Sequence, residues 1–411
     1  MSPSPVRCSA YEHLLNDLAE ELQDLEHDGL LRRLTAVESV DGPVVRIEGR
    51  ELVSWCSNDY LGLSQHPALI EAASRAAADC GIGGRASRLL AGTTRWHLRL
   101  EERLAAWFGA ESAIVFSSGY LANLGAVAAL CSSQDVVLID RLAHASLVDA
   151  ARASRATLRV FRHNDMGQVA SLLSQHPQAR RRVIITEGVF SMEGDRAPLA
   201  ELAGLADAHE AMVYVDDAHG AFVTGATGRG SPEAAGLPHA RFLYMGTLGK
   251  ALGCQGGFVI GPRPLVEFLR NRAKTFIYTT ALAGPVAASA AAALDLLERD
   301  PSRPALLLER VRQLHERLAP VAPTPLPGPS HIVPIIVGSA ERALALSRRL
   351  WDRGFWAPAI RPPTIPEGGA RLRVSVTALH TQAQIDALAD ALRDALAEGP
   401  WIRDHAPETV R

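Results

Sequence analysis

The sequence contains almost no lysine. Lys250 and Lys274 are the only two in 411 residues, and arginine carries nearly all of the remaining positive charge. A guanidinium group stays protonated in proteins, so arginine cannot take over a task that requires an amine to lose its proton. A general bias toward arginine explains the scarcity equally well, and the count alone therefore assigns no role to either lysine.

Cysteine is also scarce, and long apolar runs are missing. The five cysteines are scattered, odd in number and without CxxC spacing, which argues against a disulfide framework and a structural zinc site. The segment MSPSPVRCSA has no apolar core that would indicate a secretory signal, and the Ala-rich run at 281–297 is too short to span a bilayer. The net charge of −3 gives no reason to expect nucleic acid or an anionic membrane as a partner. We therefore expect a soluble cytoplasmic protein.

Short apolar segments alternate with helical segments through the middle of the chain. Strands are expected at 112–116, 136–140, 158–161, 182–186, 212–215 and 242–245. This alternation predicts an α/β protein with a mainly parallel sheet flanked by helices. Proline-rich breaks at 300–304 and 323–329 indicate a smaller α+β domain beyond it. We expect three regions: an N-terminal helix and strands that pack with the small domain (1–56), the large domain (57–300) and the small α+β domain (301–411).

Polar side chains follow the expected strands at one end. Seven of them lie at or just past a strand end: His144, Glu187, Ser191, Asp216, His219, Thr247 and Lys250. Because the carboxyl ends of parallel strands meet at one edge of a sheet, we expect these side chains to converge there, although each alone could be an ordinary loop residue. The turn Ser117-Ser118-Gly119-Tyr120 joins a strand to a helix, and the free N–H groups of such a turn can bind an anion.

Lys250 lies in a glycine-lined turn behind the last of these strands, a setting typical of a buried nucleophilic amine beside a phosphate site. A salt-bridged surface lysine is the plainer alternative. A metal site is another, but only Asp216 and His219 are close in sequence, and no HExxH or Cys/His set is present. Pyridoxal 5′-phosphate (PLP) accounts for more of the residues: its aldehyde would be attached to Lys250, Asp216 would pair with the pyridinium nitrogen and His219 would bond the ring oxygen. The remaining residues would bind the phosphate: the Gly119 turn, Ser191 and Thr247.

Four segments carry a resemblance to a known family: NDYLG at 58–62, TEGVFSMEGD at 186–195, DDAHG at 216–220 and TLGK at 247–250. They resemble the α-oxoamine synthases, a family of fold-type I PLP-dependent transferases that condense an amino acid with an acyl thioester. The resemblance covers nearly the whole chain, from about residue 31 to the last helix. Segments 140–147, 162–165 and 360–366 most resemble the members that join L-alanine to a pimeloyl thioester in biotin biosynthesis, with release of CO2 and free thiol.

The resemblance implies a role for each matching residue. Catalytic roles fall on Lys250, His144, Asp216 and His219. Cofactor contacts fall on Gly119, Tyr120, His144, Ser191, Asp216, His219, Thr247, Lys250, Thr279 and Thr280. Substrate contacts fall on Arg32, Asn58, His144, Arg361 and Thr364. Among these, Arg361 would hold the amino acid carboxylate and Arg32 would lie near the pimeloyl end; no metal is implied.

The resemblance also implies a homodimer with the active site at the interface, in which Tyr278-Thr279-Thr280 belongs to the segment lent by the partner subunit. The acyl group would arrive on coenzyme A or on a carrier protein. The glycine-rich loop departs from the family, because Arg85 and Ala86 stand where glycine is usual. This departure leaves the substrates open: glycine with acetyl-CoA or succinyl-CoA, serine with a long acyl-CoA, and, on the same fold, an aminotransferase remain alternatives.

Overall fold

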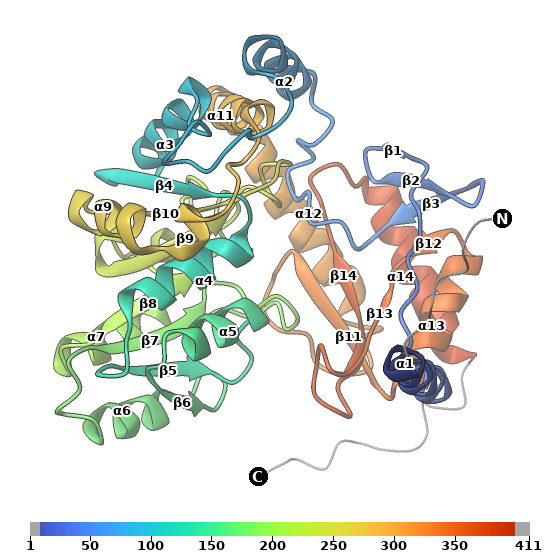
Figure 1. The fold of residues 1–411 in the computed structure, drawn as a ribbon. Coiled ribbons are helices and arrows are strands. Elements are labelled where there is room, and N and C mark those ends of the chain that lie inside the picture. Colours follow the sequence, from blue (N-terminus) through green and yellow to red (C-terminus); the bar gives the residue numbers. More distant parts are fainter. Residues whose placement is uncertain (1–8, 399–411) are drawn as a thin grey trace.

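The computed structural model describes residues 9–398, and its largest element is a seven-stranded sheet (Figure 1). The strand order is β4-β10-β9-β8-β7-β5-β6. The strands are β4 (Ser112–Phe116), β5 (Val136–Asp140), β6 (Thr157–Phe161), β7 (Arg182–Glu187), β8 (Met212–Asp216), β9 (Phe242–Thr247) and β10 (Gly257–Gly261). Neighbouring strands are parallel except at β10, which runs antiparallel to both β4 and β9. The prediction of an α/β protein with a mainly parallel sheet is confirmed.

Both faces of this sheet are apolar, because successive residues of a strand point to opposite faces and helices cover each one. Val115, Leu138 and Ile184 pack into the core on one face, and Ile114 and Ile139 belong to the core of the other. The first face is covered by α3 (Arg95–Phe108), α6 (Met166–Ser174), α7 (Leu199–Ala208) and α11 (Gly284–Arg299). The second is covered by α4 (Gly119–Leu130), α5 (Ala145–Ala153), α9 (Arg263–Arg272) and α10 (Lys274–Ile277). Helix α2 (Pro67–Cys80) packs on α11, and α8 (Ser231–Ala234) and the 3-10 helix His239–Arg241 lie in the connection from β8 to β9.

A buried ion pair joins the loop before α3 to the large sheet. Arg88 Nη1 and Nη2 lie 2.9 and 3.1 Å from the two carboxylate oxygens of Glu101, and both side chains are 6% exposed. Glu101 also accepts a bond of 3.0 Å from the backbone N–H of Val115 in β4. The pair therefore fixes the glycine-rich loop, which lacks regular structure, against a rigid strand.

Two smaller sheets lie beside the large one, with strands drawn in blue and in orange to red in Figure 1. One has the order β11 (Ile332–Gly338), β14 (Ala370–Ser375), β13 (Ala359–Ile360) and is antiparallel. The other consists of β1 (Ser39–Asp41), β2 (Val44–Ile47), β3 (Arg50–Ser54) and β12 (Phe355–Trp356). Helices α12 (Ser302–Leu318), α13 (Ala340–Asp352) and α14 (Gln382–Ala397) pack with them.

Strand β3 pairs in parallel with β12, so that Val53 lies opposite Phe355. This pairing supports the proposed grouping of the N-terminal strands with the C-terminal region, although the boundaries at residues 56 and 300 stay predictions. Residues 1–8 and 399–411, which include Cys8, lie outside the described part of the chain.

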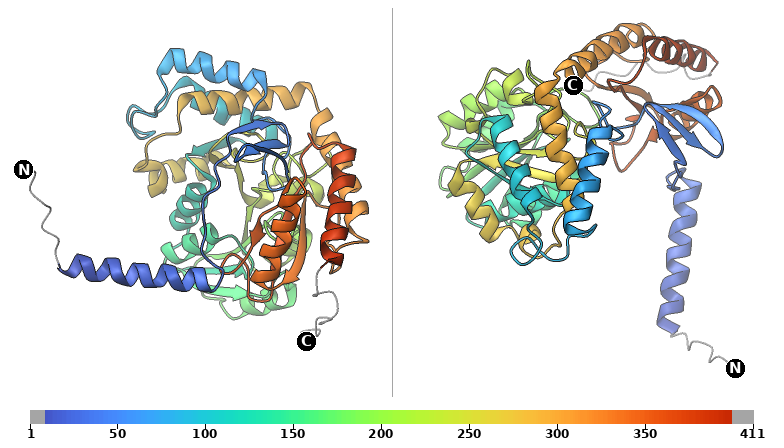
Figure 2. Two further views of the ribbon diagram at one scale, coloured as in Figure 1. Left: turned by 90° about the vertical axis from the view of Figure 1, so that its right-hand side faces the viewer. Right: turned by 90° about the horizontal axis from the view of Figure 1, so that it is seen from above.

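Helix α1 (Ser9–His27) stands away from the body of the molecule (Figure 2). One stripe of it is apolar and exposed: Tyr11, Leu14, Leu15, Leu18, Leu22 and Leu25. Leucines at this spacing normally face a partner, so this stripe is a surface that another element is expected to cover. Between residues 9 and 398, no helix combines the length and the apolar character needed to cross a bilayer.

Candidate active site

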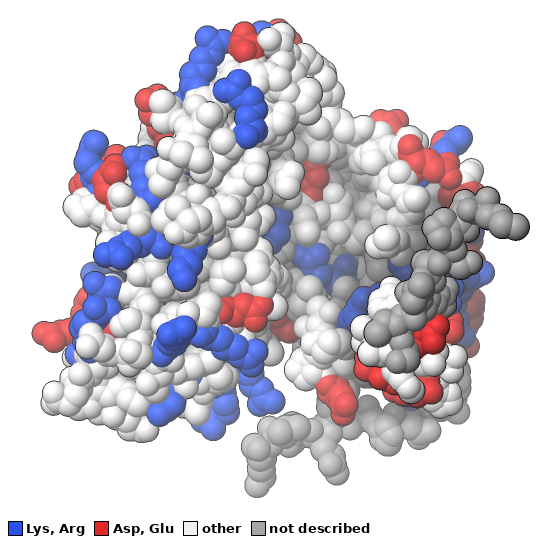
Figure 3. Space-filling view, viewed as in Figure 1, with Lys and Arg blue, Asp and Glu red and all other residues white. Residues whose placement is uncertain are grey.

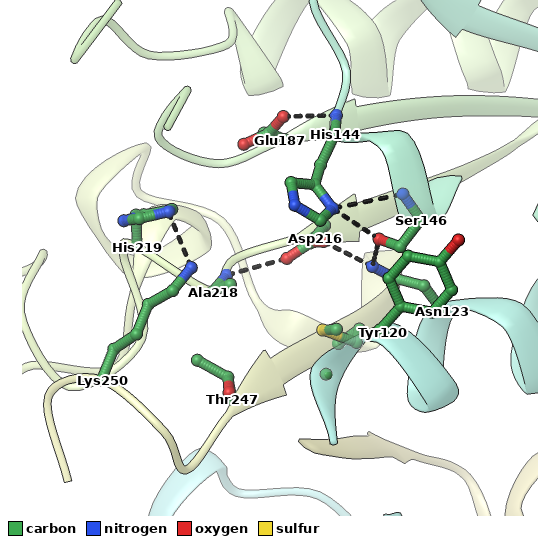
Figure 4. A pocket seen from close by; sticks show the side chains of 12 residues that line it. Tyr120, Asn123, His144, Ser146, Glu187, Asp216, Ala218, His219, Thr247 and Lys250 are labelled. Carbon is green, nitrogen blue, oxygen red and sulfur yellow. Dashed lines mark hydrogen bonds between the residues drawn. The ribbon is translucent and has the colours of Figure 1, made fainter. Parts of the chain in front are cut away.

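A cavity of about 200 Å³ lies at the edge of the large sheet where β5, β7, β8 and β9 end (Figure 4). Its lining comes from these strand ends and from the first turns of α4 and α5: Gly119, Tyr120, Asn123, His144, Ser146, Glu187, Asp216, Ala218, His219, Met245, Thr247 and Lys250. Six of the seven polar residues expected at this edge are brought together here. The seventh, Ser191, lines a neighbouring cavity.

Asp216 is a buried carboxylate whose two oxygens are both held. Its Oδ2 accepts a bond of 2.6 Å from Asn123 Nδ2, and its Oδ1 accepts one of 2.9 Å from the backbone N–H of Ala218. Asn123 is itself oriented, because its Oδ1 accepts from Tyr214 and its Nδ2 also donates to Ser146. These donors satisfy both oxygens of the carboxylate and fix its direction. Asp216 can therefore present a negative charge to a cationic group in the cavity.

Lys250 contacts His219, and a chain of hydrogen bonds continues from there. Lys250 Nζ lies 2.7 Å from His219 Nε2, and His219 Nδ1 lies 2.7 Å from the Tyr60 hydroxyl, which donates to Asn58 Oδ1 at 3.1 Å. Burial lowers the pKa of Lys250 to about 8, although the charges of Asp216 and Glu187 oppose it. Burial, with the charges of Lys250 and Arg373, holds the pKa of His219 well below its usual range. A neutral His219 can therefore accept from Lys250, which retains a reactive neutral fraction near neutral pH.

His144 lies where the first cavity meets the second and is positioned through its own backbone. Its N–H donates to Glu187 Oε1 at 2.7 Å, and Glu187 Oε2 accepts from the N–H of Ser191 at 3.2 Å. Its Nδ1 lies 2.7 Å from Ser146 Oγ. Burial lowers the pKa of His144, so its ring is a neutral, flat surface that suits contact with another aromatic ring.

Arg373 is a buried cation that the sequence motifs do not reveal. It lies on β14 and donates from Nε to the Ser191 carbonyl at 2.5 Å, from both terminal nitrogens to Asn58 Oδ1 at 3.2 Å, and from Nη2 to the Tyr60 hydroxyl at 3.2 Å. Neutral oxygens therefore surround it, and its charge also acts on His219. A signal for it exists in the pattern Arg371-Leu372-Arg373-Val374, because arginines in an apolar, buried strand require specific partners.

The start of α4 forms a further part of the first cavity, which Gly119 and Tyr120 line. Ser118 caps the helix by accepting from the N–H of Leu121 at 3.2 Å. Thr247 Oγ1 donates to the Gly256 carbonyl at 2.8 Å and accepts from the N–H of Gly249 at 3.1 Å. A helix N-terminus beside a threonine is a suitable site for a phosphate.

A second cavity of about 590 Å³ adjoins the first, and His144 lines both. Its walls are Arg141, Leu142, Ala143, His144, Ala145, Ser191, Met192, Glu193, Pro363, Thr364, Ile365 and Pro366. Arg32 Nη2 lies 3.4 Å from both Thr364 Oγ1 and the Pro362 carbonyl, and Arg361 donates to the Gly29 carbonyl. The predicted substrate residues of this region thus gather beside the larger cavity.

The predicted residues therefore fall into three groups. Those of the first cavity are Gly119, Tyr120, His144, Asp216, His219, Thr247 and Lys250. Those in or next to the second are Ser191, Thr364, Arg32 and Arg361, while Asn58 contacts Arg373. Thr279 and Thr280 line neither cavity; the Thr280 carbonyl accepts from Ser117 at 3.0 Å, and the neighbouring Tyr278 is 79% exposed. Their predicted cofactor contact stays a prediction that requires a second subunit.

The amino-acid sequence is similar to those of known proteins. The sequence profile described as aminotransferase class I and II matches residues 50–392. An 8-amino-7-oxononanoate synthase from Methylobacillus flagellatus is 44% identical over 379 residues, covering 92% of this chain and 96% of the relative. The protein of the same name from Anaeromyxobacter dehalogenans is 45% identical over 386 residues, covering 94% and 97%. The chain belongs to the α-oxoamine synthases.

Solved structures agree with this assignment. A serine palmitoyltransferase from S. paucimobilis with bound PLP and myriocin superposes with a TM-score of 0.88 at 32% identity, covering 93% of this chain and 97% of that one. An 8-amino-7-oxononanoate synthase from Francisella tularensis superposes with a TM-score of 0.73 at 28% identity, covering 84% and 98%.

PLP is the cofactor of the family, and the residues of the first cavity fit it. Asp216 offers an oriented carboxylate for the pyridinium nitrogen and Lys250 an amine for the aldehyde. The α4 N-terminus and Thr247 suit the phosphate. A Cβ added to Gly119 would lie 3.3 Å from Met245 Cε and reduce the space in this part of the cavity.

Proposed function

We propose that the chain condenses L-alanine with a pimeloyl thioester to give 8-amino-7-oxononanoate, CO2 and free thiol, as in biotin biosynthesis. The observation that carries this proposal is the likeness over nearly the full length to proteins of that name, at 44–45% identity. The geometry supports it, because a small site with a lysine, a histidine and a carboxylate opens next to a larger cavity with room for an acyl chain.

PLP, when bound, withdraws electrons from the Cα of the amino acid, so that this carbon can lose a proton and act as a nucleophile. Lys250 is placed to take up that proton and later return it, because its lowered pKa keeps part of the amine neutral. Asp216 would hold the proton of the pyridinium nitrogen, and His144 would contact the ring face. In the overall reaction a bond forms between Cα and the thioester carbonyl carbon, the C–S bond breaks, and the leaving thiolate takes up one proton from solvent. The bond between Cα and the alanine carboxylate breaks to release CO2, and Cα takes back the proton held by Lys250.

Arg373, rather than Arg361, is the residue that we propose for the amino acid carboxylate. Arg373 is buried and reaches the Lys250 amine through Tyr60 and His219. Neither arginine lines the first cavity, but Arg361 donates to the Gly29 carbonyl and lies beside the second cavity instead. If a carboxylate bound to Arg373, an anion would replace the neutral oxygens that accept its hydrogen bonds in this structure. Hydrogen bonds from a guanidinium group to an anion are stronger than those to a neutral oxygen. Arg361 is thereby left for the second cavity.

We propose that the second cavity receives the acyl chain, with Thr364 in its lining and Arg32 hydrogen-bonded to Thr364. A hollow separates the large sheet from the smaller sheets, and basic side chains are visible inside it, with acidic ones in its upper part (Figure 3). Coenzyme A and acyl carrier proteins are both anionic, so this hollow would favour the approach of either carrier.

We also propose that the protein is a cytoplasmic homodimer with the site completed by the partner subunit. The exposed apolar stripe of α1 and the exposed segment at Tyr278 both need a covering surface. Four described cysteines, Cys56, Cys80, Cys131 and Cys254, are free thiols, as expected in a reducing compartment. Light scattering should give twice the 44.0 kDa chain mass, and replacing Leu18 and Leu22 with aspartate should weaken the dimer. A monomeric wild-type protein with full activity would overturn this part of the proposal.

The function is tested by product analysis. The chain, loaded with PLP, is mixed with alanine, glycine or serine and with pimeloyl-CoA, acetyl-CoA, succinyl-CoA or palmitoyl-CoA. Thiol release and mass spectrometry of the product identify the accepted pair. Alanine with pimeloyl-CoA should be turned over fastest, Lys250→Ala should abolish turnover, and Lys274→Arg should leave it unchanged.

The serine palmitoyltransferase likeness makes serine with palmitoyl-CoA the main rival pair. Faster turnover of that pair would replace the proposed substrates while keeping the reaction class. Exchange of amino groups with keto acids without thiol release would contradict the reaction class itself.

A further inference from the structure

His163 lies between two carboxylates from different segments, Asp140 at the end of β5 and Asp195 in the loop after β7. Its Nδ1 is 3.0 Å from Asp140 Oδ1, and its Nε2 is 2.8 Å from Asp195 Oδ2. An ionised carboxylate only accepts hydrogen bonds and a neutral imidazole has one N–H, so only the imidazolium can satisfy both contacts. Burial alone would lower the pKa of His163, but the hydrogen bonds and charges of Asp140 and Asp195 outweigh it and raise the pKa to about 10. The ring therefore carries a positive charge throughout the neutral pH range.

The two carboxylates are adjacent in sequence to two segments that line the second cavity, residues 141–145 and 191–193. Asp140 ends β5 and directly precedes the wall formed by residues 141–145. It also fixes that wall, because its Oδ1 accepts from the N–H of Leu142 at 2.8 Å. Asp195 closely follows the wall formed by residues 191–193, and its carbonyl accepts from the N–H of Phe190 at 2.9 Å. His163 therefore links Asp140 and Asp195, each of which is adjacent to one of these two walls.

His163 comes from a third element and is itself held rigidly. It follows β6, and its ring meets Phe190 edge-on with 4.4 Å between ring centroids. The next residue, Asn164, has the left-handed φ of 53° and donates from its backbone to Asp140 Oδ2 at 3.0 Å and from its side chain to Asp195 Oδ2 at 3.2 Å. The other charged groups nearby have partners of their own, since Glu193 pairs with Arg371 at 3.1 Å and Arg162 with Asp165 at 2.5 Å.

We propose that His163 is a positioning residue that fixes the loops 141–145 and 191–195 relative to each other and thereby sets the fit of the acyl chain in the second cavity. The inference rests on the proposed function, because it takes that cavity as the acyl site. A neutral side chain in place of His163 would leave Asp140, which is fully buried, without its counter-charge. The loops would then separate or rearrange, whereas Lys250, His219 and Asp216 in the first cavity, none of which belongs to these loops, would keep their geometry.

The test measures the function of each cavity separately in the PLP-loaded enzyme. The first is monitored by exchange of the alanine Cα proton with solvent deuterium in the absence of thioester, and the second by the KM of pimeloyl-CoA. In His163→Gln, exchange should stay within about twofold of the wild type, and the KM of the thioester should rise roughly tenfold, as is common when a substrate-positioning group is lost. His163→Lys, which keeps a cation with several N–H donors, should recover part of the lost affinity.

His176→Gln is the matched control, because His176 lies just after α6 and its Nε2 has no hydrogen-bond partner within the described residues. It should leave both measurements unchanged. Asp195→Asn removes the negative charge from the same contact and serves if His163→Gln does not fold; it should raise the KM of the thioester selectively as well.

Equal losses of proton exchange and thioester turnover in these variants would show a general structural role and overturn the inference. An unchanged KM for the thioester in His163→Gln or Asp195→Asn would also overturn it. If the wild type accepts a thioester other than pimeloyl-CoA, the proposed substrate is wrong, but the same comparison made with the accepted thioester still decides the role of His163.

Discussion

The environment of Lys250 predicts an amine that titrates near pH 8. The shift of its pKa from 10.5 to about 8 corresponds to about 3 kcal/mol of destabilisation of the ammonium form. At pH 7.5 it raises the neutral fraction from about 0.1% to roughly a quarter, a gain of about two hundredfold for an amine that must react with an aldehyde. Burial causes the shift, and the charges of Asp216 and Glu187 limit it. Removing either carboxylate should therefore lower the pKa of Lys250 further.

The scarcity of lysine makes this measurable. Reductive methylation with carbon-13 formaldehyde in the PLP-free protein labels the two lysines and the N-terminal amine, and Lys274→Arg removes one lysine signal and so assigns the other. The Lys250 signal should titrate near pH 8 in the wild type and at lower pH in Asp216→Asn. Asp149→Asn is the matched control, because Asp149 bonds Tyr120 at the cavity but does not act on Lys250. A Lys250 signal that titrates above pH 10, or a rise in Asp216→Asn, would refute the reasoning.

Other predictions concern stability and substrate binding. Glu101→Gln leaves Arg88 buried without its counter-charge and should lower the free energy of unfolding in urea by about 3 kcal/mol; a loss below 1 kcal/mol would contradict the role of this ion pair. Gly188→Ala places a Cβ 2.0 Å from a buried aspartate oxygen and should cost about 2 kcal/mol or more, whereas Gly204→Ala, in open space within α7, should be neutral or stabilising by up to about 1 kcal/mol. Arg373→Lys should raise the KM of alanine by at least tenfold and leave the KM of the thioester nearly unchanged; a reversed pattern would assign Arg373 to the acyl site.

Much of the large domain follows from the sequence, because its strands are short apolar runs between helices. The six expected strands are all present, and their ends differ from the expected ones by at most two residues. Strand β10 is present in the structure but is not among the six expected strands, because the glycines at its two ends, Gly257 and Gly261, resemble a continuation of the turn before it. Glycine is required at 257 because a Cβ there would lie 2.6 Å from Gly119 Cα, a contact that only the folded sheet creates.

The candidate site also contains both residues that the sequence predicts and residues that it does not. His144, Asp216 and Lys250 could be predicted together because each follows a parallel strand, and such strands end at a common edge. Arg373 has only the general signal of an arginine in a buried strand, because its link to Tyr60 joins residues 313 positions apart and cannot be read from the sequence. Asn123 carries a weaker local signal, since it lies one helical turn after Gly119 and so shares its face.

The parallel pairing of β3 with β12 has a consequence for synthesis of the chain. Val53 leaves the ribosome about 300 residues before Phe355, its partner across the ladder. During that interval the hairpin of β2 and β3 has an open edge with unsatisfied backbone groups, while the seven-stranded sheet can already assemble behind it. The nascent protein should therefore depend most on chaperones late in translation, and a ribosome-stalled fragment that ends before residue 355 should be more prone to aggregate than one that ends after α14.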